Sequence, residues 1–202
     1  MTDDPRRHSP AAERNRAAIL TELQRLLPPQ GVLLEIASGT GQHAAHCSPG
    51  LPGWQWQPSE YDAEMLPAIR TWCAGLDRVR APLQLDVLSN EWSVPAQVDA
   101  IFCANMIHIA PWECCVGLMR GAARHLSPQG MLITYGPHLE DGVETSPGNL
   151  GFDVDLRMRN PAWGLRRRED VEHEATQAGL MLRERVAMPT NNLLLVWARR
   201  LH

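Results

Sequence analysis

The sequence predicts an α/β fold, with a doubly wound and mostly parallel sheet that ends in an antiparallel hairpin. Short apolar runs alternate with segments of helical spacing, one run leads directly into a glycine-rich loop, and two apolar runs close the chain. Strands that alternate with helices of about 10–15 residues are typical of parallel βαβ units, whose crossovers are right-handed. With 202 residues, 44% of them hydrophobic, the chain predicts one globular domain over residues 9–202, preceded by a flexible arm over residues 1–8.

The first half of the chain contains the helix and the strand that lead into the glycine loop. Ser9 and Pro10 have the N-cap and first-turn character of a helix start, and Pro28-Pro29 stops the apolar residues that follow at helical spacing. Gly31 then opens the apolar strand VLLEIA. Weaker signals predict strands over residues 54–58, 83–86 and 98–104 and a helix over residues 62–75.

The second half continues the alternation and then interrupts it. A helix is predicted over residues 111–126 and a strand over residues 131–136. No regular period holds from Pro137 to Trp163, and long irregular segments of compact domains are usually functional or disordered. A last helix is predicted over residues 169–179, followed by strands over residues 180–188 and 191–200 that Pro189 to Asn192 join.

The composition of the chain disfavours some binding partners and excludes some catalytic chemistries. The 19 basic and 23 acidic side chains give a net charge of −4, which disfavours nucleic acid as a partner. Every basic residue is arginine, so a P-loop lysine and Schiff-base catalysis are excluded. The five cysteines form no CxxC pair, and no stretch approaches the ~18 apolar residues of a membrane span. We therefore expect a small-molecule ligand, reduced thiols and a cytoplasmic location, and the sequence leaves the oligomeric state open.

The glycine loop is the strongest local motif. Gly39, Gly41 and Ala44 match the G-x-G-x-x-A pattern of dinucleotide-binding loops, after a predicted strand and at the start of a helix. Glycine lets the backbone approach a ligand and adopt positive φ. The pattern also fits a plain tight turn or a nicotinamide-dependent oxidoreductase. Glu35 argues against both, because a strand buried on both faces rarely contains a carboxylate without a partner.

The segment from Glu35 to Gly41 resembles the E/D-x-G/A-x-G-x-G loop of class I S-adenosylmethionine-dependent methyltransferases. This resemblance implies a Rossmann-like domain that binds S-adenosylmethionine and holds the methionine half of the cofactor over the loop. The implied contacts are Glu35, Ala37, Ser38, Gly39, Thr40 and Gly41.

Polar residues at the ends of the following strands extend this predicted site. Glu60 stands 19 residues after Gly41, where an acidic residue would accept hydrogen bonds from ribose hydroxyls. The family pattern implies that Asp86, with Val87, contacts the adenine edge, although an aspartate there also suits a helix cap. Asn105 ends the next strand. Because ligands bind outside the carboxyl ends of parallel strands, these residues predict one cofactor site at that edge.

Longer blocks of the chain resemble a narrower family. Residues 9–15, 105–112, 135–137, 145–147 and 188–193 look like the signature blocks of the methyltransferase-like 26 family, and the likeness covers residues 9–200. Thr190 departs from it, because we expect alanine at that position in the family. The resemblance implies the methyltransferase fold but supplies no acceptor.

His108 is the candidate catalytic residue. It lies three residues after Asn105, so it could take a proton from an acceptor atom or align that atom by a hydrogen bond. A buried structural histidine is the alternative. The nearby His43, His46 and Cys47 lack a fourth ligand at zinc-site spacing, so no metal is expected.

Candidate acceptor-binding residues come from the irregular segment and from the first helix. Arginine suits bidentate capture of a carboxylate, and aromatic walls suit a flat ring. The sequence therefore predicts a small carboxylate-bearing, amino-acid-like acceptor, methylated preferably on an amine or imidazole nitrogen. Arg157 is the preferred anchor, although it could instead be a solvated or ion-paired arginine, and the first helix is a possible lid. The predicted contacts are Arg14, Asn15, Tyr135, Asn149, Phe152, Arg157 and Trp163. A nicotinamide oxidoreductase and a catalytically silent cofactor-binding subunit are the alternative functions.

Overall fold

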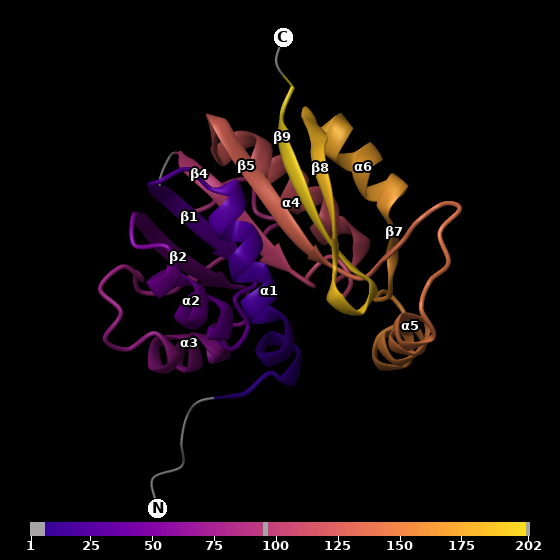
Figure 1. Ribbon diagram of the computed structural model, residues 1–202, viewed down its shortest axis with the longest axis horizontal. Helices are drawn as coiled ribbons and strands as arrows, with labels where there is room; N and C mark the ends of the chain where they lie inside the picture. The colour runs from indigo at the N-terminus through magenta and orange to yellow at the C-terminus, as the bar shows by residue number, and fades with distance from the viewer. Residues whose placement is uncertain (1–6, 95–96, 201–202) are drawn as a thin grey trace, which may run out of the picture.

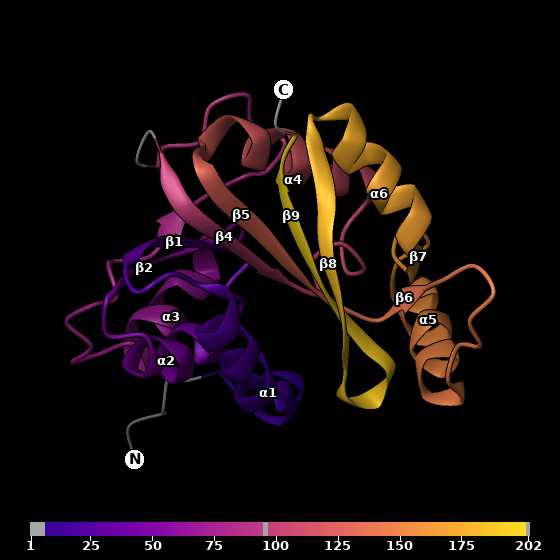
Figure 2. The ribbon, with the colours of Figure 1, turned by 45° about the horizontal axis from the view of Figure 1, so that its top comes forward.

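The structure is a computed structural model that describes residues 7–94 and 97–200. Within these ranges seven strands form one sheet in the order β3-β2-β1-β4-β5-β9-β8 (Figures 1 and 2). Its first five strands pair in parallel, whereas β9 is antiparallel to β5 and β8 is antiparallel to β9. The strands are β1 Gly31–Ile36, β2 Trp54–Glu60, β3 Leu83–Gln84, β4 Val98–Ala104, β5 Leu126–Gly136, β8 Leu180–Met188 and β9 Asn192–Arg199. The predicted mostly parallel sheet with a C-terminal antiparallel hairpin is confirmed.

Helices cover both faces of the sheet (Figure 1). On one face lie α1 (Pro10–Leu26), α2 (Gln42–Cys47) and α3 (Leu66–Trp72), and on the other lie α4 (Trp112–His125) and α6 (Arg168–Gln177). Ile19 and Leu23 of α1 pack with Leu33 of β1 in the core under the first face. The central strands are buried on both faces, as parallel strands usually are, and this explains their nearly continuous apolar sequences.

Residues 137–163 contain regular structure that the sequence pattern did not predict. Helix α5 spans Pro147–Arg159, and β6 (His138–Leu139) pairs in parallel with β7 (Arg166–Arg167). The Ser146 hydroxyl caps α5 by accepting a hydrogen bond from the Asn149 amide at 3.3 Å. Helical spacing was obscured because Pro147, Gly148 and Gly151 interrupt it and because only Asn149 and Leu156 of this helix are buried. The prediction of an irregular segment was therefore wrong over α5.

Several predicted boundaries also shift. Strand β3 is two residues long, and the helix expected over residues 62–75 divides into a 3₁₀ turn, Ala63–Met65, and α3. Of the expected arm, residues 1–6 lie outside the described residues. Its last part contacts α3, because the Arg7 carbonyl accepts a hydrogen bond from the Trp72 indole at 2.8 Å.

Candidate functional site

The glycine loop is held in shape by a buried carboxylate. Glu35 at the end of β1 is 1% exposed and accepts hydrogen bonds from the Ser38 hydroxyl at 2.9 Å and from the Trp56 indole at 3.0 Å. Burial raises the pKa of Glu35 from 4.5 to about 7, while these two hydrogen bonds oppose the rise. The Ser38 hydroxyl also accepts a hydrogen bond from the Ser59 amide, so Glu35 and Ser38 together join the loop to β2.

Left-handed backbone conformations give the loop its shape. Ala37, Gly39 and Gly41 have φ values of 54°, 56° and 88°. A Cβ at Gly41 would lie 2.8 Å from the Ile69 backbone, whereas a Cβ at Gly39 would meet nothing within 4 Å. Gly41 therefore serves close packing against α3, and Gly39 exposes the backbone to open space that a ligand can approach.

The other predicted cofactor residues lie at the carboxyl ends of neighbouring strands. The Glu60 carboxylate accepts hydrogen bonds from the Gly39 amide and the Tyr61 amide, both at 2.8 Å, and this joins the end of β2 to the loop. Asn105 adopts a left-handed φ of 62° directly after β4. Asp86 is exposed and accepts a hydrogen bond from the Leu88 amide at 2.9 Å, so it also caps a turn, and Val87 beside it is buried.

Helix α1 is attached to the start of α2 through two side chains that the sequence analysis did not assign. The Gln42 amide oxygen accepts hydrogen bonds from the Ser9 amide at 2.5 Å and from the Thr40 hydroxyl at 2.9 Å. His43 Nε2 lies 2.8 Å from Asn15 Oδ1. Their position directly after Gly41 was the available signal, because side chains of a helix that follows such a loop lie beside the site.

Tyr135 brings the end of β5 to the same edge. It is 4% exposed, and burial raises the pKa of its phenol, while a hydrogen bond from the Asn15 side chain and the Arg14 charge lower it in part. Three of the predicted acceptor contacts, Arg14, Asn15 and Tyr135, are thus brought together beneath the first turns of α1.

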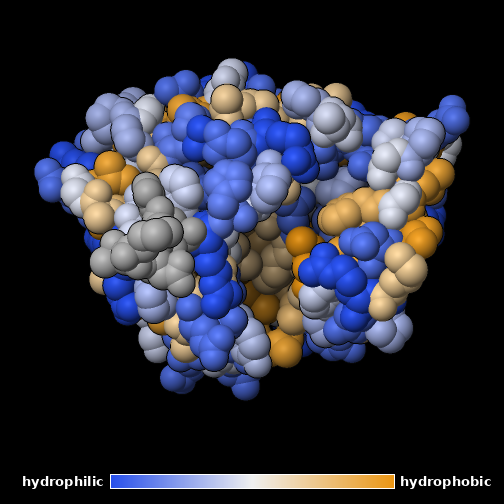
Figure 3. All heavy atoms as spheres, turned by 90° about the horizontal axis from the view of Figure 1, so that it is seen from below, coloured by the Kyte–Doolittle hydropathy of each residue, from blue (hydrophilic) through white to orange (hydrophobic). Residues whose placement is uncertain are grey.

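A hollow opens at this edge of the molecule. Figure 3 shows it from below in the orientation of Figure 1, between the half that carries α1 to α3 and the half that carries α5. Apolar residues gather inside the hollow and hydrophilic residues flank it (Figure 3). An apolar cavity with a few polar groups at its wall is the usual form of a small-molecule site.

His108 is buried behind this edge rather than exposed to it. Its ring is 1% exposed and meets the His138 ring edge-on at 4.6 Å between centroids. Among the described residues no nitrogen of either ring has a hydrogen-bond partner at ordinary geometry, and the backbones of Gly164 and Arg166 act on the pKa of His108 and His138 only by raising it in part. Burial lowers the pKa of His108 well below 6.5 and that of His138 to about 4, so both rings are neutral at pH 7. A methyl acceptor can reach His108 only if the loop around it opens.

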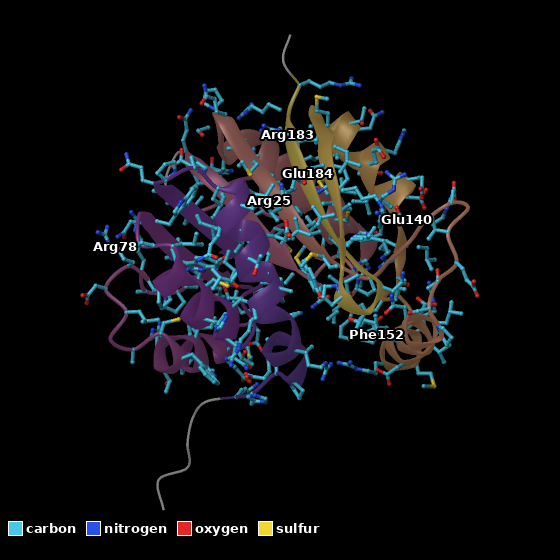
Figure 4. The ribbon with its side chains drawn as sticks, viewed as in Figure 1. Arg25, Arg78, Glu140, Phe152, Arg183 and Glu184 are labelled. Atoms are coloured by element: carbon cyan, nitrogen blue, oxygen red, sulfur yellow. The ribbon has the colours of Figure 1, made fainter. Side chains whose placement is uncertain are left out.

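The acceptor contacts predicted on and after α5 lie elsewhere. Asn149 donates hydrogen bonds from Nδ2 to the Asn191 carbonyl at 2.8 Å and to Asn191 Oδ1 at 3.1 Å, so its amide nitrogen holds α5 to the β8–β9 turn. Figure 4 shows Phe152 on α5 near that turn. Trp163 lies beneath the Arg159 guanidinium, 5.3 Å from the ring centroid.

Arg157, the preferred carboxylate anchor, is already paired. It donates a hydrogen bond to Asp153 at 2.9 Å and lines a cavity of about 530 Å³ beside Trp112 and Arg166. None of the glycine-loop residues lines that cavity. Arg166 donates to the carbonyls of Ile107 and Ala110, at 3.2 and 2.9 Å, so it supports the loop that carries His108. The structure therefore separates Arg157 from the group formed by Arg14, Asn15 and Tyr135.

Within residues 7–94 and 97–200, no three histidine, cysteine, aspartate or glutamate side chains gather in a way that could hold a metal ion. None of the helices in these ranges is long and apolar enough to cross a membrane.

The fold is that of class I S-adenosylmethionine-dependent methyltransferases. CalO1, a methyltransferase of calicheamicin biosynthesis with S-adenosylhomocysteine bound, matches with a TM-score of 0.76 and 20% identity over 94% of this chain and 55% of its own. The mitomycin 7-O-methyltransferase MmcR matches with a TM-score of 0.81 and 14% identity over 94% and 54%. Human N-acetylserotonin methyltransferase in complex with S-adenosylmethionine matches with a TM-score of 0.77 and 13% identity over 95% and 53%. The chain spans about half the length of these proteins, and at such identities the likeness shows the fold.

Family membership is narrower than the fold. The model of the family described as "Protein of unknown function (DUF938)" matches residues 6–199. The chain belongs to this family, which confirms the resemblance seen in the signature blocks.

Proposed function

We propose that the protein is an S-adenosylmethionine-dependent methyltransferase of a small carboxylate-bearing, amino-acid-like molecule, with nitrogen as the preferred acceptor atom. One observation carries the proposal. The glycine loop, shaped by buried Glu35 and joined to Glu60, presents open backbone at the carboxyl edge of a methyltransferase fold.

The residues present fit the cofactor. Open space at Gly39 leaves room for the methionine half beside the loop backbone. Glu60 Oε1 accepts the Tyr61 and Asp62 amides, whereas Oε2 accepts only the Gly39 amide among the described residues. Oε2 therefore keeps a lone pair with which the carboxylate can accept a ribose hydroxyl. Asp86, Val87 and Asn105 are the proposed contacts on the adenine side. Bound S-adenosylmethionine supplies an electrophilic methyl group on its sulfonium.

The polar group under α1 is the proposed acceptor site. Arg14 provides a charge beside Tyr135, and the two together suit a carboxylate that accepts hydrogen bonds. The chain's main contribution is then alignment of the acceptor with the methyl group at near-attack distance.

His108 stays our candidate for the group that takes the acceptor's proton. Its ring is neutral and has an unshared nitrogen lone pair with no partner among the described residues. Because the ring is buried, this role requires the segment after β4 to open when the acceptor binds. His108→Gln is expected to lower kcat with little change in donor affinity, and an unchanged kcat would leave His108 a structural residue.

Donor binding is tested first. Gly39→Arg places a bulky side chain in the proposed methionine position, and calorimetric titration should show no S-adenosylmethionine binding. Gly75→Arg is the matched control, since Gly75 also has positive φ, at 79°, and open space around its Cβ position. Glu60→Ala should weaken binding by about 1.5–3 kcal/mol through loss of charge-assisted hydrogen bonds. Unchanged affinity in folded Gly39→Arg and Glu60→Ala proteins contradicts the donor site.

The acceptor is tested with labelled donor and a panel of amino acids, each beside its methyl ester. Esterification is expected to abolish turnover of the active compound. Arg14→Gln should raise the KM for that compound, whereas Arg157→Gln, on the separate cavity, should leave it unchanged. If Arg157→Gln raises the KM and Arg14→Gln does not, the acceptor binds in the Arg157 cavity instead. If the protein binds S-adenosylmethionine but methylates none of the compounds, the result favours a catalytically silent cofactor-binding subunit.

A further inference from the structure

The cavity of about 530 Å³ beside Arg157 is lined by none of the glycine-loop residues, and the proposed reaction does not use it. Its wall comes from the first residue of α4, from the β6–β7 pair, from the last turn of α5 and from α6. Figure 2 shows β6 and β7 between α5 and α6. Trp112, Leu139 and Leu165 make part of the wall apolar. A volume of this order, with apolar and charged groups around it, is typical of small-molecule sites.

Arg166 has a fixed position in the wall of this cavity. Its Nε donates a hydrogen bond to the Ile107 carbonyl at 3.2 Å, and its Nη2 donates to the carbonyls of Ala110 and Ala162 at 2.9 and 2.6 Å. Its guanidinium also lies over the Trp112 ring, 5.6 Å from the centroid. The hydrogen bonds occupy three of the five N–H groups of the guanidinium. The two N–H groups on Nη1 have no hydrogen-bond partner among the described residues.

The charge of Arg166 has no counter-ion in the described part of the chain. Its hydrogen-bond acceptors are neutral carbonyls, and no carboxylate of that part lies within 4.0 Å of it. By contrast, Arg157 pairs with Asp153 at 2.9 Å. Arg167 pairs with Asp141. Burial lowers the pKa of Arg166, and the nearby charge of Arg157 lowers it further, so these surroundings favour an anion beside it.

Glu174 of α6 is an unpaired carboxylate on the same wall. It is half-buried, and its side chain has neither a hydrogen bond nor an ion pair with any residue that the structure describes. Asp170, the other carboxylate of the wall, pairs with Arg167 at 3.6 Å. Arg166 and Glu174 thus give the cavity one positive and one negative group that the described residues leave without a charged partner.

We propose that this cavity binds a free α-amino acid with a large apolar side chain, at a site separate from the donor and acceptor sites. Arg166 Nη1 donates to the carboxylate of the ligand, and Glu174 accepts from its ammonium group. The side chain packs on Trp112, Leu139 and Leu165. Because carbonyls already hold Arg166, binding orders no flexible arginine side chain. This inference goes beyond the proposed function, since the site needs neither S-adenosylmethionine nor methyl transfer.

Binding can be measured by ¹H–¹⁵N NMR on the full-length protein labelled at arginine, with the Nε–H signal of Arg166 assigned by its loss in Arg166→Lys. L-Phenylalanine, L-leucine and L-methionine are titrated without S-adenosylmethionine, and at least one of them is expected to shift this signal. The amide of that amino acid lacks the carboxylate, and its N-acetyl derivative lacks the ammonium group. Each derivative should bind at least about tenfold more weakly. No shift with any of the three at millimolar concentration, or equal binding of either derivative, overturns the proposal.

Glu174→Gln tests the ligand site while leaving the hydrogen bonds of Arg166 in place. The amino acid should bind about tenfold more weakly to this variant, whereas its N-acetyl derivative, which has no ammonium group, should bind as it does to the wild type. Glu64→Gln, at an exposed position outside the cavity wall, is the matched control and should change neither affinity. Unchanged affinity for the amino acid in Glu174→Gln overturns the proposal.

Arg14→Gln separates this site from the proposed acceptor site. The shift of the Arg166 signal should be the same in Arg14→Gln as in the wild type. Loss of that shift would place the amino acid at the acceptor site and overturn the proposal. Because the titration needs no donor and no turnover, the failure of this site and the failure of the proposed function are distinguishable.

Discussion

The two sides of the hollow are built in different ways. On one side, α1 is anchored by fully buried Ile19 and Leu23 and by the hydrogen bond between Asn15 and His43 at the start of α2. On the other side, α5 is held by the Asn149 amide at the β8–β9 turn and by the side chain of Leu156. A helix attached through a core moves only with the domain, whereas one attached by few contacts opens at lower cost. We therefore expect the α5 side, rather than α1 as a whole, to open for ligands.

The exposed face of α5 supports this contrast. Leu150, Val154 and Met158 recur at helical spacing and are 50%, 56% and 75% exposed. The first helix, α1, was itself predicted as a possible lid over the site, and its burial restricts that role. Its second half belongs to the core through Ile19 and Leu23, whereas Arg14 and Asn15 lie in its first turns.

The largest expected effect is a difference in unfolding free energy between the same substitution in α1 and in α5. Leu23→Ala leaves a cavity in the core and should cost about 2–5 kcal/mol of unfolding free energy. Leu150→Ala, the same substitution on the exposed face of α5, should stay within about 0.5 kcal/mol of the wild type. Urea unfolding measures both. Equal losses would show that α5 is as tightly packed as α1.

A second prediction concerns the carboxylate beneath the loop. Because the pKa of Glu35 is about 7 in the folded protein and 4.5 unfolded, the folded state retains the proton longer, and stability falls as pH rises from about 4.5 to 7. The rise in pKa corresponds to about 3 kcal/mol over that window. Glu35→Gln should remove this pH dependence in urea unfolding at pH 5 and pH 7.5. A wild-type protein whose stability rises over the same window would contradict the burial effect.

A third prediction tests the attachment of α5. Asn149→Ala removes two hydrogen bonds to Asn191 and should cost about 1–2 kcal/mol, mostly as local opening. Hydrogen exchange should accelerate over residues 147–159 and stay unchanged over residues 10–26. Asn90→Ala, at an exposed position, is the control. Faster exchange in both helices would mean that the two sides open together.

The smallest effect is expected where α1 meets the hairpin on the surface. Arg25 pairs with Glu184 of β8 at 2.5 Å, with both side chains substantially exposed (Figure 4). Because exposed pairs are screened by salt and contribute little, Arg25→Gln should barely lower the melting temperature and the difference should vanish in high salt. Arg183→Gln, on the same strand, is the control. A large effect of Arg25→Gln would mean that α1 depends on its surface contact as well as on its core.

Local patterns were sufficient for the α1 side. The strand, the glycine loop and the helix after it are consecutive in the sequence. The helical spacing of apolar residues alone predicts α1. Spacing and strand order predicted Glu60 and Asn105, and the family resemblance implied Asp86; all three follow strands whose carboxyl ends meet at one edge. The role of these residues in cofactor binding stays a prediction.

The α5 side could not be predicted in the same way. Its helix contains proline and glycines near its start and has two buried residues, so the periodic signal is weak. Its attachment runs to Asn191, 42 residues further along the chain, and such a pairing leaves no local pattern. Arg157 looked like a free anchor because its partner Asp153 lies one helical turn away in a helix that was not recognised.

The sequence by itself determined the mostly parallel sheet, the antiparallel hairpin, the glycine loop and the family. Each of these follows from a pattern of neighbouring residues or from the order of such patterns along the chain. Only the tertiary structure decided that Glu35 joins the loop to β2, that His108 is buried against His138, and that His43 of α2 lies within hydrogen-bond distance of Asn15 of α1. These contacts join side chains from segments that are far apart in the sequence, and they form only where packing excludes water. Burial and hydrogen-bond partners of that kind arise from packing, and packing sets the protonation and orientation on which the chemistry depends.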